Sequence, residues 1–81
     1  MEKKWQYLQK LYEIDPYGDE YYDGISIGNT LSLSEQETIS IIRFLTRKDY
    51  INTVGDNWDQ LGRYDIILLD KGIEFIESNN D

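Results

Sequence analysis

Residues 27–38 read IGNTLSLSEQET, and this stretch decides how the chain folds. Ser34 is followed three positions later by Glu37, which is the pattern of a capping box. In that motif the serine hydroxyl accepts the backbone N–H of the glutamate, and the glutamate carboxylate accepts the backbone N–H of the serine. We therefore predict a short helix that ends near Leu31, a tight turn at Ser32 and a second helix that begins at Ser34.

The helix that begins at Ser34 has two different faces. At 100° per residue, its apolar side is made by Thr38, Ile41, Ile42 and Leu45. The opposite side carries Gln36, Ser40, Arg43 and Arg47, with Ile39 and Phe44 on the flanks. Arg47 and Lys48 fall in the last turn, where cations complement the negative helix end. Two helices joined by a tight turn form a helix-turn-helix, a unit that can place its second helix in a DNA groove.

Upstream of this unit, the sequence predicts one helix and one short strand. Apolar residues recur at spacings of three and four over residues 3–14, at Trp5, Leu8, Leu11, Tyr12 and Ile14. The Asp15-Pro16 step and Gly18 end this helix, because the residue before proline avoids helical angles. Residues 21–22 form a very short strand, and Asp23 then caps the helix that runs to about Leu31.

Downstream, two β-rich runs at residues 50–54 and 64–69 predict a hairpin with an open loop at 55–63. Asp70 then caps a last helix that holds Ile73 and Ile76, with Phe75 at its side. Residues 78–81 form a disordered tail.

This order of elements resembles the winged-helix family of small prokaryotic and phage proteins. The resemblance covers about residues 24–77 and is carried by 27–33, 34–51 and the closing run LDKGIEFIE at 69–77. That run looks like the "L-T-x-K-G" step that follows the second wing strand in many small regulators of this family. The resemblance implies an α+β winged-helix fold in the order helix, strand, helix, helix, strand, wing, strand, helix, with a three-helix core and a small antiparallel sheet.

The sequence departs from the family pattern at three acidic residues. Asp49 stands where such domains usually carry glycine after the recognition helix, and Asp56 and Asp59 stand in a wing that usually carries Arg or Lys. The wing also contains Trp58. Its indole can stack on a base or fill a partner's pocket, or it can fold back over the hairpin and cover the small core.

Composition limits the remaining functions. The 81 residues make a single domain, 1–81. The absence of cysteine excludes thiolate chemistry. The absence of histidine removes both the commonest metal ligand and the commonest general base. The acidic stretch from Asp15 lacks calcium-loop spacing, so we expect no metal. We also expect no catalytic residues, no cofactor, no membrane segment and a cytoplasmic location.

Charge is unevenly distributed, and it leaves two functions open. The net charge is −8, yet residues 40–48 hold three cations and no anion, whereas 13–23 hold five anions and no cation. In the first interpretation this is a transcriptional regulator: Gln36 and Ser40 reach base edges, and Arg43 and Arg47 contact guanines or phosphates. The positive surface would also include Lys48 and Arg63.

In the second interpretation the helix face is merely solvated, with arginine–carboxylate pairs worth about 0–1 kcal/mol each. The protein is then an acidic interaction module or DNA mimic that binds a protein through Ile39, Phe44 and Trp58, or through the acidic loop. For the regulator we expect a homodimer through the first and last helices, at Trp5, Tyr12 and Phe75, because one such module buries little surface on DNA.

Overall fold

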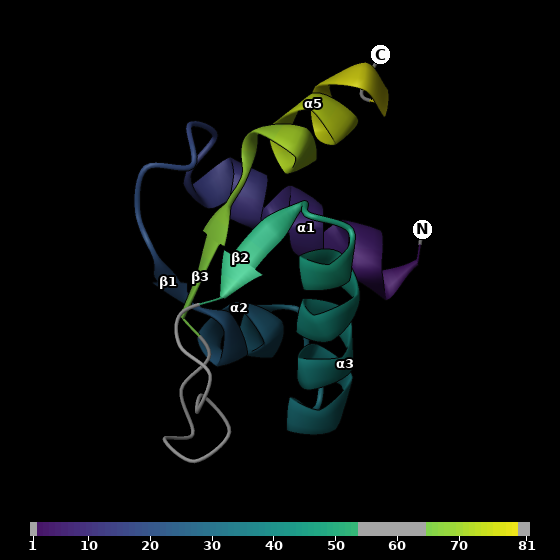
Figure 1. The fold of residues 1–81 in the computed structure, drawn as a ribbon. Coiled ribbons are helices and arrows are strands. Elements are labelled where there is room, and N and C mark those ends of the chain that lie inside the picture. Colours follow the sequence, from purple (N-terminus) through teal and green to yellow (C-terminus); the bar gives the residue numbers. More distant parts are fainter. Residues whose placement is uncertain (1, 54–64, 80–81) are drawn as a thin grey trace.

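A computed structural model describes residues 2–53 and 65–79. In chain order (Figure 1), the elements are α1 (Lys3–Ile14), β1 (Tyr22–Asp23), α2 (Gly24–Thr30), α3 (Glu35–Arg47), β2 (Ile51–Thr53), β3 (Asp65–Leu68) and α5 (Asp70–Asn79). Helices α1, α2 and α3 surround one core, and the strands form a small sheet beside them. This is an α+β fold of winged-helix type, as the sequence predicts.

The sheet has the strand order β1-β3-β2, and both pairings are antiparallel. In the hairpin Ile51 lies opposite Leu68, and on the other edge of β3 Tyr22 lies opposite Ile66. The predicted hairpin pairing is therefore confirmed. The predicted wing, with Asp56, Trp58, Asp59 and Arg63, lies outside the described residues.

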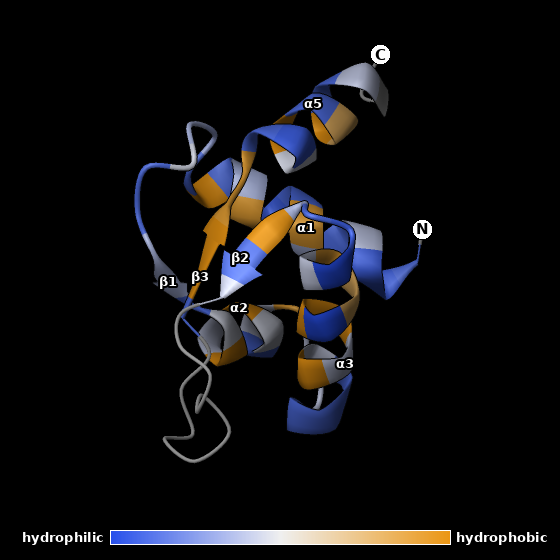
Figure 2. Ribbon diagram, in the orientation of Figure 1, coloured by the Kyte–Doolittle hydropathy of each residue, from blue (hydrophilic) through white to orange (hydrophobic). Residues whose placement is uncertain are grey.

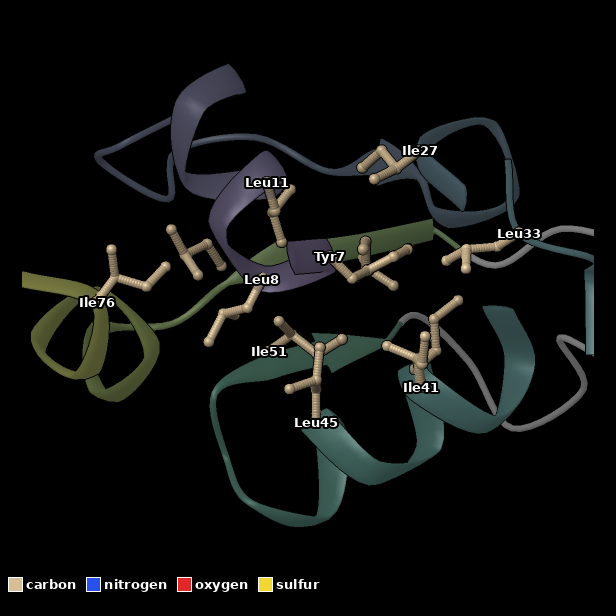
Figure 3. Close-up of a cluster of buried hydrophobic side chains, with 12 residues drawn as sticks. Tyr7, Leu8, Leu11, Ile27, Leu33, Ile41, Leu45, Ile51 and Ile76 are labelled. Carbon is tan, nitrogen blue, oxygen red and sulfur yellow. The ribbon is translucent and has the colours of Figure 1, made fainter. Parts of the chain in front are cut away.

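The core is made by apolar side chains from α1, α2, α3 and α5, from the sheet, and from the turn before α3. Figure 2 shows apolar residues on β2, β3 and parts of every helix, and Figure 3 shows their side chains meeting in one cluster. The buried apolar residues are Tyr7, Leu8, Leu11, Ile27, Leu33, Ile41, Ile42, Leu45, Ile51, Ile66, Leu68 and Ile76.

The residues of α1 that are buried in the core differ in part from those that the sequence predicts. Tyr7 is fully buried, and its hydroxyl donates to the Gly24 carbonyl oxygen at 2.8 Å. That bond satisfies the one polar group the side chain brings into the core, which is the usual condition for burying a tyrosine. Trp5 and Tyr12 lie at the margin of the core, half-buried, and Ile14 is exposed.

The turn between α2 and α3 closes the helix-turn-helix as the sequence predicts. Asp23 caps α2 by accepting the Ile25 N–H at 3.1 Å. At the other end of α2, the Leu33 N–H donates to the Gly28 carbonyl and the Ser32 N–H to that of Asn29, which together make a Schellman motif. Ser32 has a φ of 60° in the left-handed region, and Leu33 is consequently turned into the core.

Helix α3 ends in a second Schellman motif, at the position where the family usually has glycine. The Tyr50 N–H donates to the Leu45 carbonyl and the Asp49 N–H to that of Thr46, both at 3.1 Å. Asp49 has a φ of 62°. A left-handed conformation favours glycine, and a negative charge at a helix C-terminus opposes the helix dipole.

Replacing Asp49 by glycine is therefore expected to raise the free energy of unfolding by about 0.5–1 kcal/mol, even after the larger entropy that glycine gives the unfolded chain. Urea denaturation followed by circular dichroism measures this. Asp49→Asn is the matched control, because it removes the charge but keeps a side chain at the left-handed position. Equal stabilisation by the two variants would show that the increase in the free energy of unfolding comes from removal of the charge alone.

Helix α5 differs from the sequence prediction at both ends. It begins at Asp70, which lies in the first turn, and the Ile73 N–H donates to the Leu69 carbonyl; Leu69 therefore precedes the helix as its cap. The tail predicted to be disordered from 78 is helical through Asn79, and residues 80–81 lie outside the described residues. Within the described part of the chain, none of these helices has the length and apolar character of a membrane span.

Candidate nucleic-acid interface

The start of α3 is fixed by the predicted capping box, and both of its hydrogen bonds are present. The Glu37 N–H donates to Ser34 Oγ and the Ser34 N–H donates to Glu37 Oε1, each at 3.1 Å. Lys3 Nζ of α1 donates to the other carboxylate oxygen of Glu37 at 2.9 Å. The hydrogen bond from Lys3, followed by that from the Ser34 amide, lowers the pKa of Glu37. Glu37 therefore ties α3 to α1, and Lys3 offsets its negative charge.

The two faces of α3 are oriented as the sequence predicts. Thr38, Ile41, Ile42 and Leu45 are buried in the core. The predicted nucleic-acid residues Gln36, Ser40, Arg43, Arg47 and Lys48 are all exposed. We call these five residues the α3 face. The sixth predicted residue, Arg63, lies outside the described residues, so the structure does not place it relative to the others.

A lysine that the sequence analysis missed lies beside the α3 face. Lys4 of α1 projects its Nζ over the Phe44 ring, 4.4 Å from the centroid, and Lys48 Nζ lies 5.8 Å from the same centroid. An ammonium group over an aromatic face is attracted by the ring quadrupole. Phe44 thus lies near one cation from α1 and one from the C-terminal cap of α3. The Lys3-Lys4 pair at the start of the chain was the available signal, but nothing local places it near α3.

An open groove of about 470 Å³ runs between the start of α1 and α3. It is lined by Glu2, Lys3, Lys4, Gln36, Glu37, Ser40 and Ile41. Two predicted base-reading residues, Gln36 and Ser40, therefore form its rim together with two lysines. The acidic residues here are both paired, since Glu2 lies 3.2 Å from Lys4 Nζ and Glu37 bonds Lys3. Exposed Asp49 directly follows Lys48 and leaves one unfavourable charge at the far end of the α3 face.

The apolar residues proposed for a protein partner are less available than the sequence suggests. Ile39 and Phe44 are half-buried and pack against the core. The Phe44 ring also meets the Trp5 ring edge to face, with centroids 5.7 Å apart. Neither residue is among the exposed large apolar residues of the described chain. The third member of that predicted set, Trp58, lies outside the described residues.

The residues expected at a dimer interface, Trp5, Tyr12 and Phe75, make contacts between α1 and α5 within the chain. The rings of Trp5 and Phe75 lie 4.9 Å apart between centroids, and Tyr50 stacks on Phe75 at 5.0 Å. The Tyr12 hydroxyl donates to Glu77 Oε2 at 3.0 Å. These contacts join α1 to α5 within one chain, and dimerisation stays a prediction.

Comparison with known proteins supports the fold. No protein-family model matches the chain, and no curated protein matches it in sequence. Among solved structures, it is similar to a probable transcriptional regulator from Pseudomonas aeruginosa, with a TM-score of 0.71 at 17% sequence identity. The match covers 93% of this chain and 52% of that one, so this chain spans about half the length of its neighbour. At this identity the likeness shows the shared fold alone.

Proposed function

We propose that this protein binds duplex DNA through the α3 face and acts as a transcriptional regulator. The observation that carries the proposal is the coincidence of two independent features. Helix α3 is the second helix of a helix-turn-helix, the element that can enter a DNA groove, and the α3 face is polar to basic in a chain of net charge −8. The name of the structural neighbour is consistent with this role.

Each part of the α3 face has a separate task in this proposal. Gln36 and Ser40 have side chains that can hydrogen-bond base edges in a major groove. Arg43, Arg47 and Lys48 follow toward the C-terminal end, and Lys4 extends the positive surface across Phe44. Such cations contact guanines or phosphates and position the protein on the duplex. Since the cations are few, we expect modest affinity and a shallow dependence on salt.

The test is an anisotropy titration of a labelled random-sequence duplex at low salt. We expect wild type to bind, and Arg43→Glu/Arg47→Glu to bind at least about tenfold more weakly, a loss of about 1.4 kcal/mol or more. Both arginines are exposed, so the variant should keep its helical circular dichroism.

A matched control separates the α3 face from net charge. Arg47→Glu and Lys10→Glu change the net charge equally, but Lys10 lies on α1 in a groove with Gln6, Gln9, Glu13 and Leu31. We expect only Arg47→Glu to weaken binding strongly. Equal effects of the two variants, or no binding by wild type, would refute the regulator proposal and favour the acidic interaction module instead.

A further inference from the structure

The large apolar side chains that are exposed in the described chain all belong to one short stretch of sequence, residues 14–21. They are Ile14, Tyr17 and Tyr21, with exposed fractions of 42%, 77% and 49%. All three belong to the end of α1 or to the segment that joins α1 to β1, at the left of Figure 1. A small soluble protein has limited apolar material for its core, so a local group of exposed large residues marks a candidate contact surface.

Acidic residues flank these side chains along the chain. Residues 11–42 contain no Lys or Arg; exposed Glu13 precedes Ile14, and exposed Asp19 and Glu20 lie between Tyr17 and Tyr21. We call Ile14, Tyr17, Asp19, Glu20 and Tyr21 the acidic–aromatic surface. In Figure 1 it lies on the side of the molecule away from α3. Its carboxylates would repel a polyanion, so DNA is not its partner.

The segment that carries this surface is held in one conformation by a buried carboxylate. Asp15 accepts the backbone N–H groups of Tyr17, Asp19 and Glu20 at 3.3, 2.9 and 3.0 Å. Burial of this carboxyl raises its pKa, but hydrogen bonds from these amides and the Tyr22 hydroxyl outweigh burial, so the net pKa is lowered and the group stays ionised.

Gly18 fixes the same segment against the sheet. Its φ is 65°, and a Cβ added there would lie 3.2 Å from the Leu68 carbonyl carbon and closer still to its oxygen. The segment is therefore anchored on β3 as well as on Asp15. A preorganised surface loses little conformational entropy when a partner binds.

We propose that the acidic–aromatic surface binds a lysine- or arginine-rich segment of another protein. Carboxylates attract such a segment, and tyrosine faces accept ammonium or guanidinium groups by cation–π contact. The inference does not depend on DNA binding, because it uses none of the α3 face. It adds a protein-binding site on the opposite side of the molecule.

A second copy of this chain fits the acidic–aromatic surface less well than a lysine- or arginine-rich segment does. Outside the α3 face, its four lysines form no run longer than Lys3-Lys4, and these two lysines are paired with Glu37 and Glu2. Two copies of net charge −8 also repel each other. A metal ion is a poorer occupant too, because no group of three carboxylates in the described residues is placed to hold one.

The test uses a synthetic peptide of lysine, arginine and glycine, titrated into the isotope-labelled protein by nuclear magnetic resonance. We expect the largest amide shifts at residues 14–21. Tyr17→Ser/Tyr21→Ser, which keeps the charge, and Asp19→Asn/Glu20→Gln, which keeps the tyrosines, should each weaken binding about tenfold. Glu35→Gln/Glu74→Gln removes the same charge from two exposed positions on other helices and should change affinity less than about twofold.

Three results would overturn the inference. The first is no peptide binding, and the second is equal weakening by the loop and control variants, which would indicate non-specific attraction to an acidic protein. The third is concentration-dependent self-association in analytical ultracentrifugation that Tyr17→Ser/Tyr21→Ser abolishes, which would assign the surface to a second copy. Because all the substituted residues are exposed, circular dichroism should show unchanged folding. A failed DNA titration leaves each of these results unaffected.

Discussion

Gly72→Ala is expected to lower the free energy of unfolding by about 2–3 kcal/mol, although alanine is the better helix former by about 1 kcal/mol. Gly72 is buried in the first turn of α5. A Cβ there would lie 3.0 Å from Leu68 Cδ1, 3.1 Å from the Tyr50 carbonyl carbon and closer still to the Tyr50 oxygen. That oxygen also accepts the Leu69 N–H at 3.0 Å, so the Tyr50 carbonyl cannot turn aside.

The added methyl group must therefore push α5 away from the start of β2. This movement would separate Phe75 from Tyr50 and from Trp5, whose fluorescence can report it. Urea denaturation measures the change in stability. Glu74→Ala, at an exposed position two residues further along α5, is the control and should stay within about 0.5 kcal/mol of wild type. A Gly72→Ala variant as stable as the control would show that α5 does not rest on this carbonyl.

Gly28→Ala is expected to cost about 1–3 kcal/mol for a related reason, but this clash involves a side chain. The new Cβ would lie 2.7 Å from Thr38 Cγ2 and 2.9 Å from Thr38 Cβ, and closer to Thr38 Oγ1. Thr38 is buried, and its hydroxyl donates to the Ser34 carbonyl oxygen at 2.8 Å. The variant would thus force α2 and α3 apart at the contact that sets their crossing.

A second substitution distinguishes this clash from a general effect of alanine. Thr38→Ala removes the two closest atoms, so Gly28→Ala/Thr38→Ala should lose less stability than the sum of the single variants, with a coupling energy of about 1 kcal/mol or more. The four proteins of this cycle are compared by urea denaturation. Strictly additive losses would mean that the two helices do not meet through this pair.

These glycines illustrate what the sequence can and cannot predict. In the sequence Gly28 is only a residue that weakens a helix by roughly 1 kcal/mol. Gly72 is only part of a pattern that resembles a family signature. Each position needs glycine because a group distant in the sequence lies against it: the Thr38 side chain at Gly28 and the Tyr50 backbone at Gly72. Local sequence patterns do not reveal such neighbours. The capping box at Ser34 was predictable because both of its partners lie within three residues.

The candidate sites also contain some features that the sequence could predict and others that it could not. The outward orientation of Arg43 and Arg47 follows from helical periodicity, so the sequence could predict it. The approach of Lys4 to Phe44 and the burial of Tyr7 depend on how α1 packs, which no local spacing encodes. In the sequence Asp15 is only the residue before Pro16 and the start of an acidic stretch. Its carboxylate instead organises the segment that follows, because three amides converge on it.

The five anions at residues 13–23 and the three cations at 40–48 make the charge distribution of the molecule asymmetric. At long range the net charge of −8 repels a nucleic acid. In the proposed complex with DNA, the field of the duplex turns the cations of α3 toward it and the carboxylates of residues 13–23 away. Added salt screens the repulsion as well as this alignment, so the rate of encounter should change less with ionic strength than it does for a uniformly basic protein.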